Sequence, residues 1–147
     1  AAEIVPVMMK RTVVKLEDKK KGKKIERYQA ISESAAKQSG RGIIPEVSMF
    51  CPWKEALARA CEFDMILLPY ESAEGITYAR DVIRQAAQLP DGAKIAVFIG
   101  PEGGFAQEEV EQAEAAGAKV ITLGNRILRT ETAGLTVLSI LMFEMER

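Results

Sequence analysis

The chain has 147 residues, with 48% apolar and 28% charged side chains and a net charge of −1, which fits one compact soluble domain and excludes a disordered chain. No apolar run approaches the roughly 18 residues that a membrane helix needs, and residues 1–10 lack the basic lead and cleavage site of a signal peptide. We therefore expect a cytoplasmic protein that makes no contact with a membrane.

The residue types present narrow the possible chemistry. The sequence holds no histidine, which excludes histidine general bases, Ser-His and Cys-His nucleophile pairs and zinc sites that need imidazole. Its two cysteines, Cys51 and Cys61, match neither a redox pair nor a set of zinc ligands, and we expect two reduced structural thiols. The sequence therefore predicts no metal site, so any chemistry rests on carboxylates, Arg, Lys, hydroxyls, backbone groups or a bound cofactor.

Three regular elements are expected in the front part of the chain, the last of them a short helix that Pro52 opens and that contains Trp53, Ala56, Leu57 and Ala60. Residues 4–8 form a short apolar run that predicts a strand. Residues 26–38 have helical spacing, with Tyr28, Ile31 and Ala35 on one face.

A basic segment lies between the strand and the first helix. Residues 1–41 hold 11 basic and 5 acidic side chains, whereas the remainder holds 9 basic and 16 acidic. Five lysines surround Gly22 in what we expect to be a mobile cationic loop: Lys19, Lys20, Lys21, Lys23 and Lys24. Two interpretations stay open: the loop binds a phosphate backbone, or it is a solvated segment that keeps the chain soluble.

From residue 63 onward, short apolar runs alternate with helical patterns. The apolar runs are 65–68, 95–99 and 120–123, and the helical patterns between them are 76–86 and 107–116. Continuous apolarity is typical of strands that are covered on both faces. The fold class predicted is therefore α/β, with a mostly parallel sheet flanked by helices.

The last element is a helix over residues 131–145 that is apolar around nearly its whole circumference. One sheet covers only one side of such a helix, so the other side needs a second partner. A dimer with twofold symmetry is the simplest solution, and we expect a homodimer.

Two unusual loops follow the second and third predicted strands. Residues 100–105 are glycine-rich, but Glu102 and Phe105 stand where a dinucleotide fingerprint needs glycine, and no Gly-Lys-Ser/Thr of a P-loop follows. The second loop runs from 123 to 131. Because parallel strands place their carboxyl ends at one edge, the two loops predict a ligand site there. The alternative is a tight turn with no ligand.

At these loops the sequence closely resembles a known family. Residues 98–105 (FIGPEGGF) and 123–133 (LGNRILRTETA) resemble the paired C-terminal motifs of RsmE-type methyltransferases, the 16S ribosomal RNA (uracil-N3) enzymes of the SPOUT class. Residues 38–41 (QSGR) resemble the family's upstream motif, and residues 12–14 (TVV) its motif near the start. The resemblance covers nearly the whole chain, with the motifs in the family's order and spacing.

The resemblance implies a fold and an activity. It implies that residues 1–147 form a SPOUT methyltransferase domain with a C-terminal trefoil knot, an obligate homodimer, S-adenosylmethionine in the knotted loops and a ribosomal RNA substrate. In the family a small β-barrel RNA-binding domain comes first, and we expect this chain to start inside the methyltransferase domain. The sequence departs from the family at Tyr28, where tryptophan is common, and at Ala106, where a helix-capping hydroxyl is common.

The resemblance also implies which residues bind the cofactor. The first loop provides Leu68, Pro69 and Tyr70, the second Gly100, Pro101, Gly103 and Gly104, and the third Leu123, Gly124, Ile127, Leu128 and Thr132. Backbone N–H and C=O groups are expected to contact the adenine, and apolar side chains of the third loop to enclose it. Glycine permits this close approach of the backbone.

For the substrate, Arg129 and Arg41 are the candidates that hold an RNA phosphate or a uracil oxygen, together with the five lysines. Glu131 or water is expected to accept the uracil N3 proton, while Arg129 stabilises the developing anion. Structural alternatives are a helix C-terminal charge for Arg41, an N-cap for Thr130 and a helix-dipole role for Glu131. Alternative functions are a SPOUT ribose 2'-O-methyltransferase and a non-catalytic RNA-binding dimer.

Overall fold

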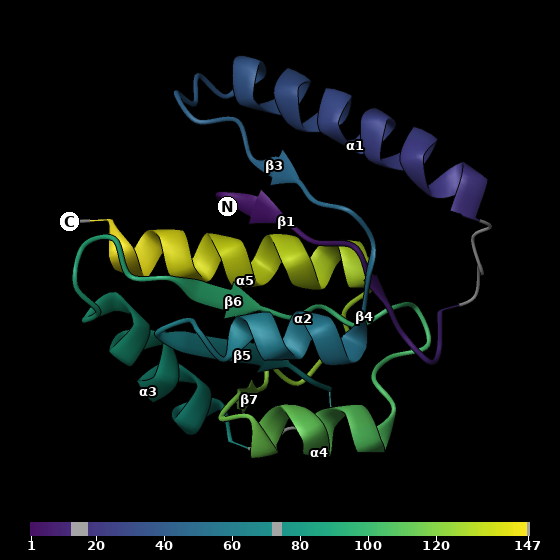
Figure 1. Ribbon diagram of the computed structural model, residues 1–147. Coiled ribbons are helices and arrows are strands. Elements are labelled where there is room, and N and C mark those ends of the chain that lie inside the picture. Colours follow the sequence, from purple (N-terminus) through teal and green to yellow (C-terminus); the bar gives the residue numbers. More distant parts are fainter. Residues whose placement is uncertain (13–17, 72–74, 147) are drawn as a thin grey trace. The chain divides into compact units, whose positions relative to one another are not determined.

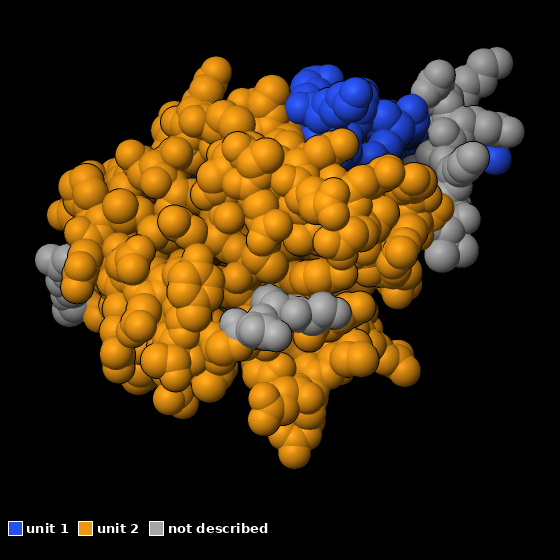
Figure 2. Space-filling model, turned by 90° about the horizontal axis from the view of Figure 1, so that it is seen from below, with its two compact units in different colours: residues 1–8, 14–56 blue, residues 9–13, 57–147 orange. Residues whose placement is uncertain are grey.

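The structure is a computed structural model that describes residues 1–12, 18–71 and 75–146. The chain divides into two compact units, one of residues 1–8 and 14–56 and the other of residues 9–13 and 57–147. Figure 1 follows the chain through its elements, and Figure 2 colours the two units separately. No helix among the described residues is long and apolar enough to cross a membrane.

The first unit consists of one long helix and two short pairs of strands. Its elements are β1 (Glu3–Ile4), β2 (Val7–Met8), α1 (Asp18–Gln38), β3 (Glu46–Val47) and β4 (Cys51–Pro52). Strand β1 pairs with β3 and β2 pairs with β4, both in parallel. The single strand expected over residues 4–8 is thus interrupted at Pro6, because proline has no N–H to donate to a strand partner.

The prediction of a mobile cationic loop is wrong, because helix α1 begins at Asp18 and includes the lysine-rich segment. Lysine is a good helix former, and a single glycine inside a helix costs only about 1 kcal/mol relative to alanine. Gly22 has no atom within 4 Å of the position that a Cβ would take. The lysines are therefore carried on a regular helix.

Helix α1 also turns a different face inward from the one expected. Tyr28 and Ile31 are 37% and 55% exposed, whereas Ser32 and Ala36 are 7% and 2% exposed. The Ser32 hydroxyl donates a hydrogen bond to the Pro45 carbonyl at 2.7 Å. A polar bond next to β3, as well as apolar spacing, sets the rotation of this helix.

The second unit contains a parallel sheet with helices packed on it. Its elements are β5 (Met65–Pro69), α3 (Ile76–Ala87), β6 (Ile95–Val97), α4 (Gln107–Ala115), β7 (Lys119–Ile121) and α5 (Thr130–Met145), while α2 (Trp53–Ala60) crosses the boundary between the units. The strand order is β6-β5-β7, and both pairings are parallel. The predicted α/β class, with parallel strands flanked by helices, is confirmed.

The core of this unit lies between the sheet and helices α3 and α5. Leu67 of β5, Ile121 of β7, Val82 of α3 and Val137 of α5 belong to one buried cluster. Ile66 is also buried and, as a neighbour of Leu67 on the strand, points to the opposite face. Central strand β5 is therefore covered on both faces, as its continuous apolar run predicts.

Candidate functional site

A pocket lies in the second unit where the three parallel strands end. It is lined by the segments after β5, β6 and β7 and by the start of α5. Strands β6 and β7 are shorter than their apolar runs, because Ile99 and Leu123 leave the sheet and line the pocket instead. The predicted meeting of the glycine-rich loop and the third loop at one edge is confirmed.

Most of the residues predicted to bind a cofactor line this pocket: Pro69, Tyr70, Gly100, Pro101, Gly104, Leu123, Gly124, Ile127 and Leu128. Three others lie outside its lining. Leu68 is fully buried in β5, Gly103 packs against Arg11, and Thr132 is exposed on the first turn of α5.

The glycine-rich loop is a tight turn as well as a pocket wall. The Gly104 N–H donates to the Pro101 carbonyl at 2.8 Å, and Gly104 has a φ of 67°, which favours glycine. A Cβ on Gly100 would lie 3.1 Å from ring atoms of Phe105, a buried side chain. The loop can therefore be both a tight turn and part of a ligand site, because the turn places its backbone in the pocket lining.

The third loop carries apolar side chains on a constrained backbone. Gly124 has a φ of 122°, and its N–H donates to the Thr122 hydroxyl, which in turn donates to the Gly124 carbonyl. Leu123 and Leu128 are half-buried, while Ile127 is 81% exposed. This loop can enclose a flat apolar ligand and contact it through backbone groups.

The candidate catalytic residues lie beside the pocket and do not line it. Arg129 and Glu131 are both exposed, and neither belongs to the lining. Thr130 is not the N-cap of α5: Arg129 holds that position with extended backbone angles, and its carbonyl accepts the Ala133 N–H at 2.8 Å. Glu131 lies in the first turn of α5, where the negative charge of a carboxylate interacts favourably with the helix dipole and stabilises the helix.

The pocket contains a carboxylate and a guanidinium that the sequence pattern did not single out, Glu71 and Arg126. The Glu71 carboxylate oxygens lie 3.6 and 3.7 Å from the position of a Cβ on Gly104, so this side chain faces the glycine-rich loop. Arg126 lies within the motif of residues 123–133, and Glu71 directly follows Tyr70 of the first loop. The signal available in the sequence was their place directly within or after those loops.

Arg41 and the lysines belong to the first unit. Arg41 follows the end of α1, is exposed, and donates to the Ala1 carbonyl at 3.2 Å. Lys20 and Lys23 are exposed, and Lys21 and Lys24 are half-buried. Of the TVV motif, residues 13 and 14 lie outside the described residues.

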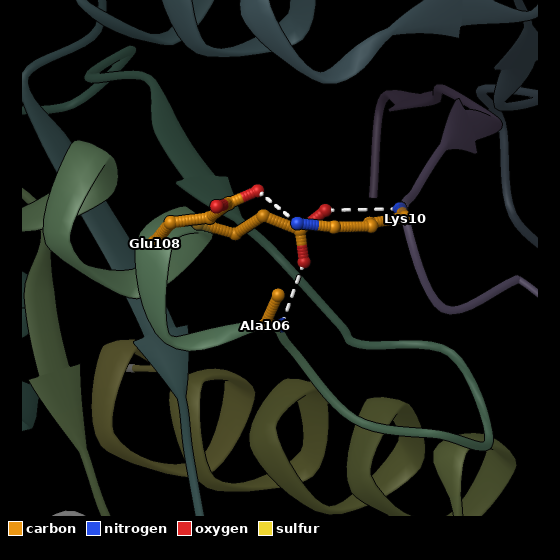
Figure 3. A network of polar contacts seen from close by, with 4 residues as sticks. Lys10, Ala106 and Glu108 are labelled. Carbon is orange, nitrogen blue, oxygen red and sulfur yellow. Dashed lines mark hydrogen bonds and ion pairs between the residues drawn. The ribbon is translucent and has the colours of Figure 1, made fainter.

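A network of polar contacts joins residues 10 and 11 to the glycine-rich loop and the start of α4, and Figure 3 shows the part around Lys10, Ala106 and Glu108. The buried Glu109 carboxylate accepts the Ala106 N–H at 2.8 Å and the Lys10 N–H at 3.0 Å. The Arg11 guanidinium donates to the Gly103 and Phe105 carbonyls. Helix α4 lacks a capping hydroxyl at Ala106, as its sequence predicts, but Glu109 provides the reciprocal half of a capping box.

Comparisons with known proteins agree with this arrangement. A family model described as "RNA methyltransferase domain" matches residues 1–142. The ribosomal RNA small subunit methyltransferase E of Bacillus subtilis is 38% identical over 99% of this chain and 57% of that protein, and that of Mesomycoplasma hyopneumoniae is 36% identical over 80% of this chain and 48% of that protein. The chain thus spans about half the length of the curated relatives that it matches.

Two similar solved structures contain a ligand. The Neisseria gonorrhoeae ribosomal RNA small subunit methyltransferase E, bound to S-adenosyl methionine, is 34% identical with a TM-score of 0.79, over 97% of this chain and 54% of that one. A Legionella pneumophila structure in complex with the bound cofactor SAM is 34% identical with a TM-score of 0.84, over 97% of this chain and 55% of that one.

Proposed function

Because this chain belongs to the family of RNA methyltransferase domains, we propose that it binds S-adenosylmethionine and methylates N3 of a uridine in 16S ribosomal RNA. The observation that carries the proposal is the pocket at the carboxyl edge of the parallel sheet, where the loops after β5, β6 and β7 meet. The names of the curated relatives and the ligands of the two similar structures support it. A ribosomal RNA substrate would place the protein in the cytoplasm.

The residues of the pocket fit this cofactor. An adenine needs an apolar slot bordered by backbone donors and acceptors, and the third loop offers Leu123, Ile127 and Leu128 on a backbone bent at Gly124. The glycine-rich loop contributes Gly104 to the lining, where the lack of a side chain lets a ligand approach the main chain closely. When bound, the cofactor supplies an electrophilic methyl group, and most of the rate acceleration comes from holding the reactants in line.

The reaction removes one proton from the uracil N3 and develops one negative charge on the base. In our proposal the Arg129 guanidinium stabilises the uracil anion as N3 loses its proton. Glu131 or solvent accepts that proton, and the pocket adds Glu71 as a second candidate carboxylate. If a carboxylate accepts the proton, replacing that carboxylate should lower turnover and leave the affinity for the cofactor unchanged.

The outward face of α5 supports a homodimer. Its apolar side chains at 135, 138, 142 and 145 are 69%, 37%, 51% and 41% exposed, whereas Val137 and Leu141 are buried. This spacing of three and four residues is that of a helix seam which packs on another helix. We propose that a second copy of the chain covers this face, and that residues 1–147 act as one SPOUT domain with a C-terminal trefoil knot.

The first unit supports binding of RNA through charge. The lysines of α1 and Arg41 place positive charge on this unit, in a chain whose net charge is −1. Arg and Lys that neutralise phosphates release counterions, so their contribution falls as salt rises. We propose that these residues position the RNA and leave sequence recognition to contacts with the bases.

Calorimetric titration with S-adenosylmethionine tests the proposal. We expect saturable binding, and the absence of binding together with retained RNA affinity would instead favour a non-catalytic RNA-binding dimer. Incubation with 16S ribosomal RNA and labelled cofactor, followed by digestion to nucleosides, identifies the product. We expect 3-methyluridine, and a 2'-O-methylated nucleoside would favour the ribose enzyme.

A further inference from the structure

A short segment from the beginning of the chain packs behind the glycine-rich loop. Residues 9–12 belong to the second unit, although about ninety positions separate them from the loop. Arg11 Nη1 donates hydrogen bonds to the Gly103 carbonyl at 3.2 Å and to the Phe105 carbonyl at 3.1 Å. A single guanidinium nitrogen therefore contacts both ends of the Gly103–Phe105 stretch.

The packing between this segment and the loop is close enough to need glycine. A Cβ on Gly103 would lie 3.1 Å from the Arg11 Cβ and 3.2 Å from the Arg11 carbonyl oxygen. Gly103 does not line the pocket, whereas Gly104, its neighbour, does. The structural reason for glycine at 103 is thus contact with Arg11.

Glu109 holds the same segment in place at a second point. Glu109 is 4% exposed, and its carboxylate accepts one backbone N–H from Lys10 and another from Ala106, so it joins the segment to the start of α4 (Figure 3). The Lys10 ammonium pairs with Glu108 at 2.7 Å, but both side chains are more than half exposed and such pairs contribute little. The buried Glu109 carboxylate therefore fixes the backbone of Lys10, the residue before Arg11, next to the loop.

We propose that Arg11 is a positioning residue for the cofactor pocket, an inference that rests on the proposed function of that pocket. The Gly103 and Phe105 carbonyls both accept from one nitrogen of Arg11, and without the cation these two dipoles would repel each other. Arg11 holds them together and so holds Gly104, which lies between them, against the pocket. Arg11 itself is not part of the pocket lining.

The test compares Arg11→Met with Arg11→Lys and with the control Lys10→Met, which removes only the exposed ion pair with Glu108. We expect Arg11→Met to weaken binding of S-adenosylmethionine by about tenfold or more, the loss equivalent to one hydrogen bond to a charged group. Arg11→Lys should restore part of the affinity, because it keeps the positive charge, and Lys10→Met should bind as the unchanged chain does.

Hydrogen exchange of the ligand-free protein supplies a readout that does not depend on the cofactor. In Arg11→Met we expect faster amide exchange over residues 100–106, with exchange in β5 unchanged. Unchanged loop exchange and unchanged affinity in Arg11→Met would overturn the proposal, as would equal losses in Arg11→Met and Lys10→Met. If Arg11→Met does not fold, Arg11→Gln takes its place as the variant without a cation, and an Arg11→Gln protein that binds and exchanges as the unchanged chain does would overturn the proposal.

The same pair of measurements separates this inference from the proposed function. If the unchanged chain fails to bind S-adenosylmethionine, the proposed function is wrong, and loop exchange alone then decides whether Arg11 positions the loop.

Discussion

The buried carboxylate of Glu109 accepts the backbone N–H of Lys10 at 3.0 Å, a contact between residues 99 positions apart. Its other oxygen accepts the Ala106 N–H at the start of α4. One side chain therefore caps a helix and anchors the segment that carries Arg11.

Glu109→Gln should destabilise the second unit by about 1–3 kcal/mol, because the amide offers only one acceptor oxygen and leaves a buried N–H without its partner. Glu108→Gln is the matched control, since Glu108 is exposed and the change should stay within about 0.5 kcal/mol. Urea unfolding of both variants provides the comparison. Equal stability of the two would show that the Glu109 contacts contribute nothing.

Gly103→Val should abolish binding of S-adenosylmethionine while the protein stays folded and dimeric, because the added side chain would displace the loop from Arg11. Gly42→Ala is a suitable control, because Gly42 has no atom within 4 Å of its Cβ position and no positive φ. Calorimetry measures the affinity and circular dichroism the fold. Retention of binding within a few-fold in Gly103→Val would contradict the assignment of the loop.

Neutralising the α1 lysines should weaken RNA binding and flatten its salt dependence. Glutamine is the right replacement at positions 19, 20, 21, 23 and 24, because its helix propensity is close to that of lysine and α1 should persist. Each phosphate contact that is lost should lower the slope of log K against log salt by about 0.7–0.9. A slope that does not change would mean that these lysines only solvate the helix.

Leu138→Asp and Leu141→Asp should give different outcomes, because only Leu141 is buried in the core of the second unit. Leu138→Asp should yield a folded monomer, whereas Leu141→Asp should unfold the unit, since it places an unpaired charge among apolar side chains. Light scattering after size exclusion and circular dichroism distinguish these outcomes. A folded, active monomer from Leu138→Asp would show that activity does not need the dimer. A Leu138→Asp protein that remains a dimer would show that α5 is not the interface.

Glu131→Gln and Glu71→Gln identify the proton acceptor. If one variant loses turnover while its affinity for the cofactor is unchanged, the carboxylate replaced in that variant is the proton acceptor. If Glu131→Gln loses only stability, Glu131 acts on the helix dipole instead.

The pH dependence of the rate is a separate prediction. Because the sequence has no histidine, the rate should rise through neutral pH with no inflection near the ordinary histidine pKa of about 6.5. Full activity of both variants, with the same pH profile, would leave solvent as the acceptor.

Much of the second unit could be predicted from the sequence, because its signals are local. The apolar run at 65–68 became β5, and the helical patterns at 76–86 and 107–116 became α3 and α4 with ends shifted by one residue. An apolar run between glycine- and proline-rich turns has few alternatives to a buried strand. The pocket followed from the same signals, since parallel strands bring their carboxyl ends to one edge.

The first unit shows where local signals mislead. The charge and the glycine of the lysine-rich segment predict a loop, but its helix propensity is high enough that α1 begins at Asp18. The inward face of α1 was also missed, because the Gln29 side chain accepts the Val47 N–H at 2.8 Å and Ser32 bonds to Pro45. Such partners are set by where the chain returns and not by the spacing of apolar residues.

By itself, then, the sequence determined the main elements of the second unit, its parallel sheet and the loops at the sheet's edge, because apolar periodicity and glycine act over a few neighbouring residues. Only the tertiary structure decided which distant residues come into contact. Arg11 donates to the Gly103 carbonyl, and Glu109 accepts the Lys10 N–H. The Glu71 carboxylate lies next to Gly104. These contacts join segments far apart in the chain, and their hydrogen-bond geometry exists only after the strands have taken their order in the sheet and brought the segments together.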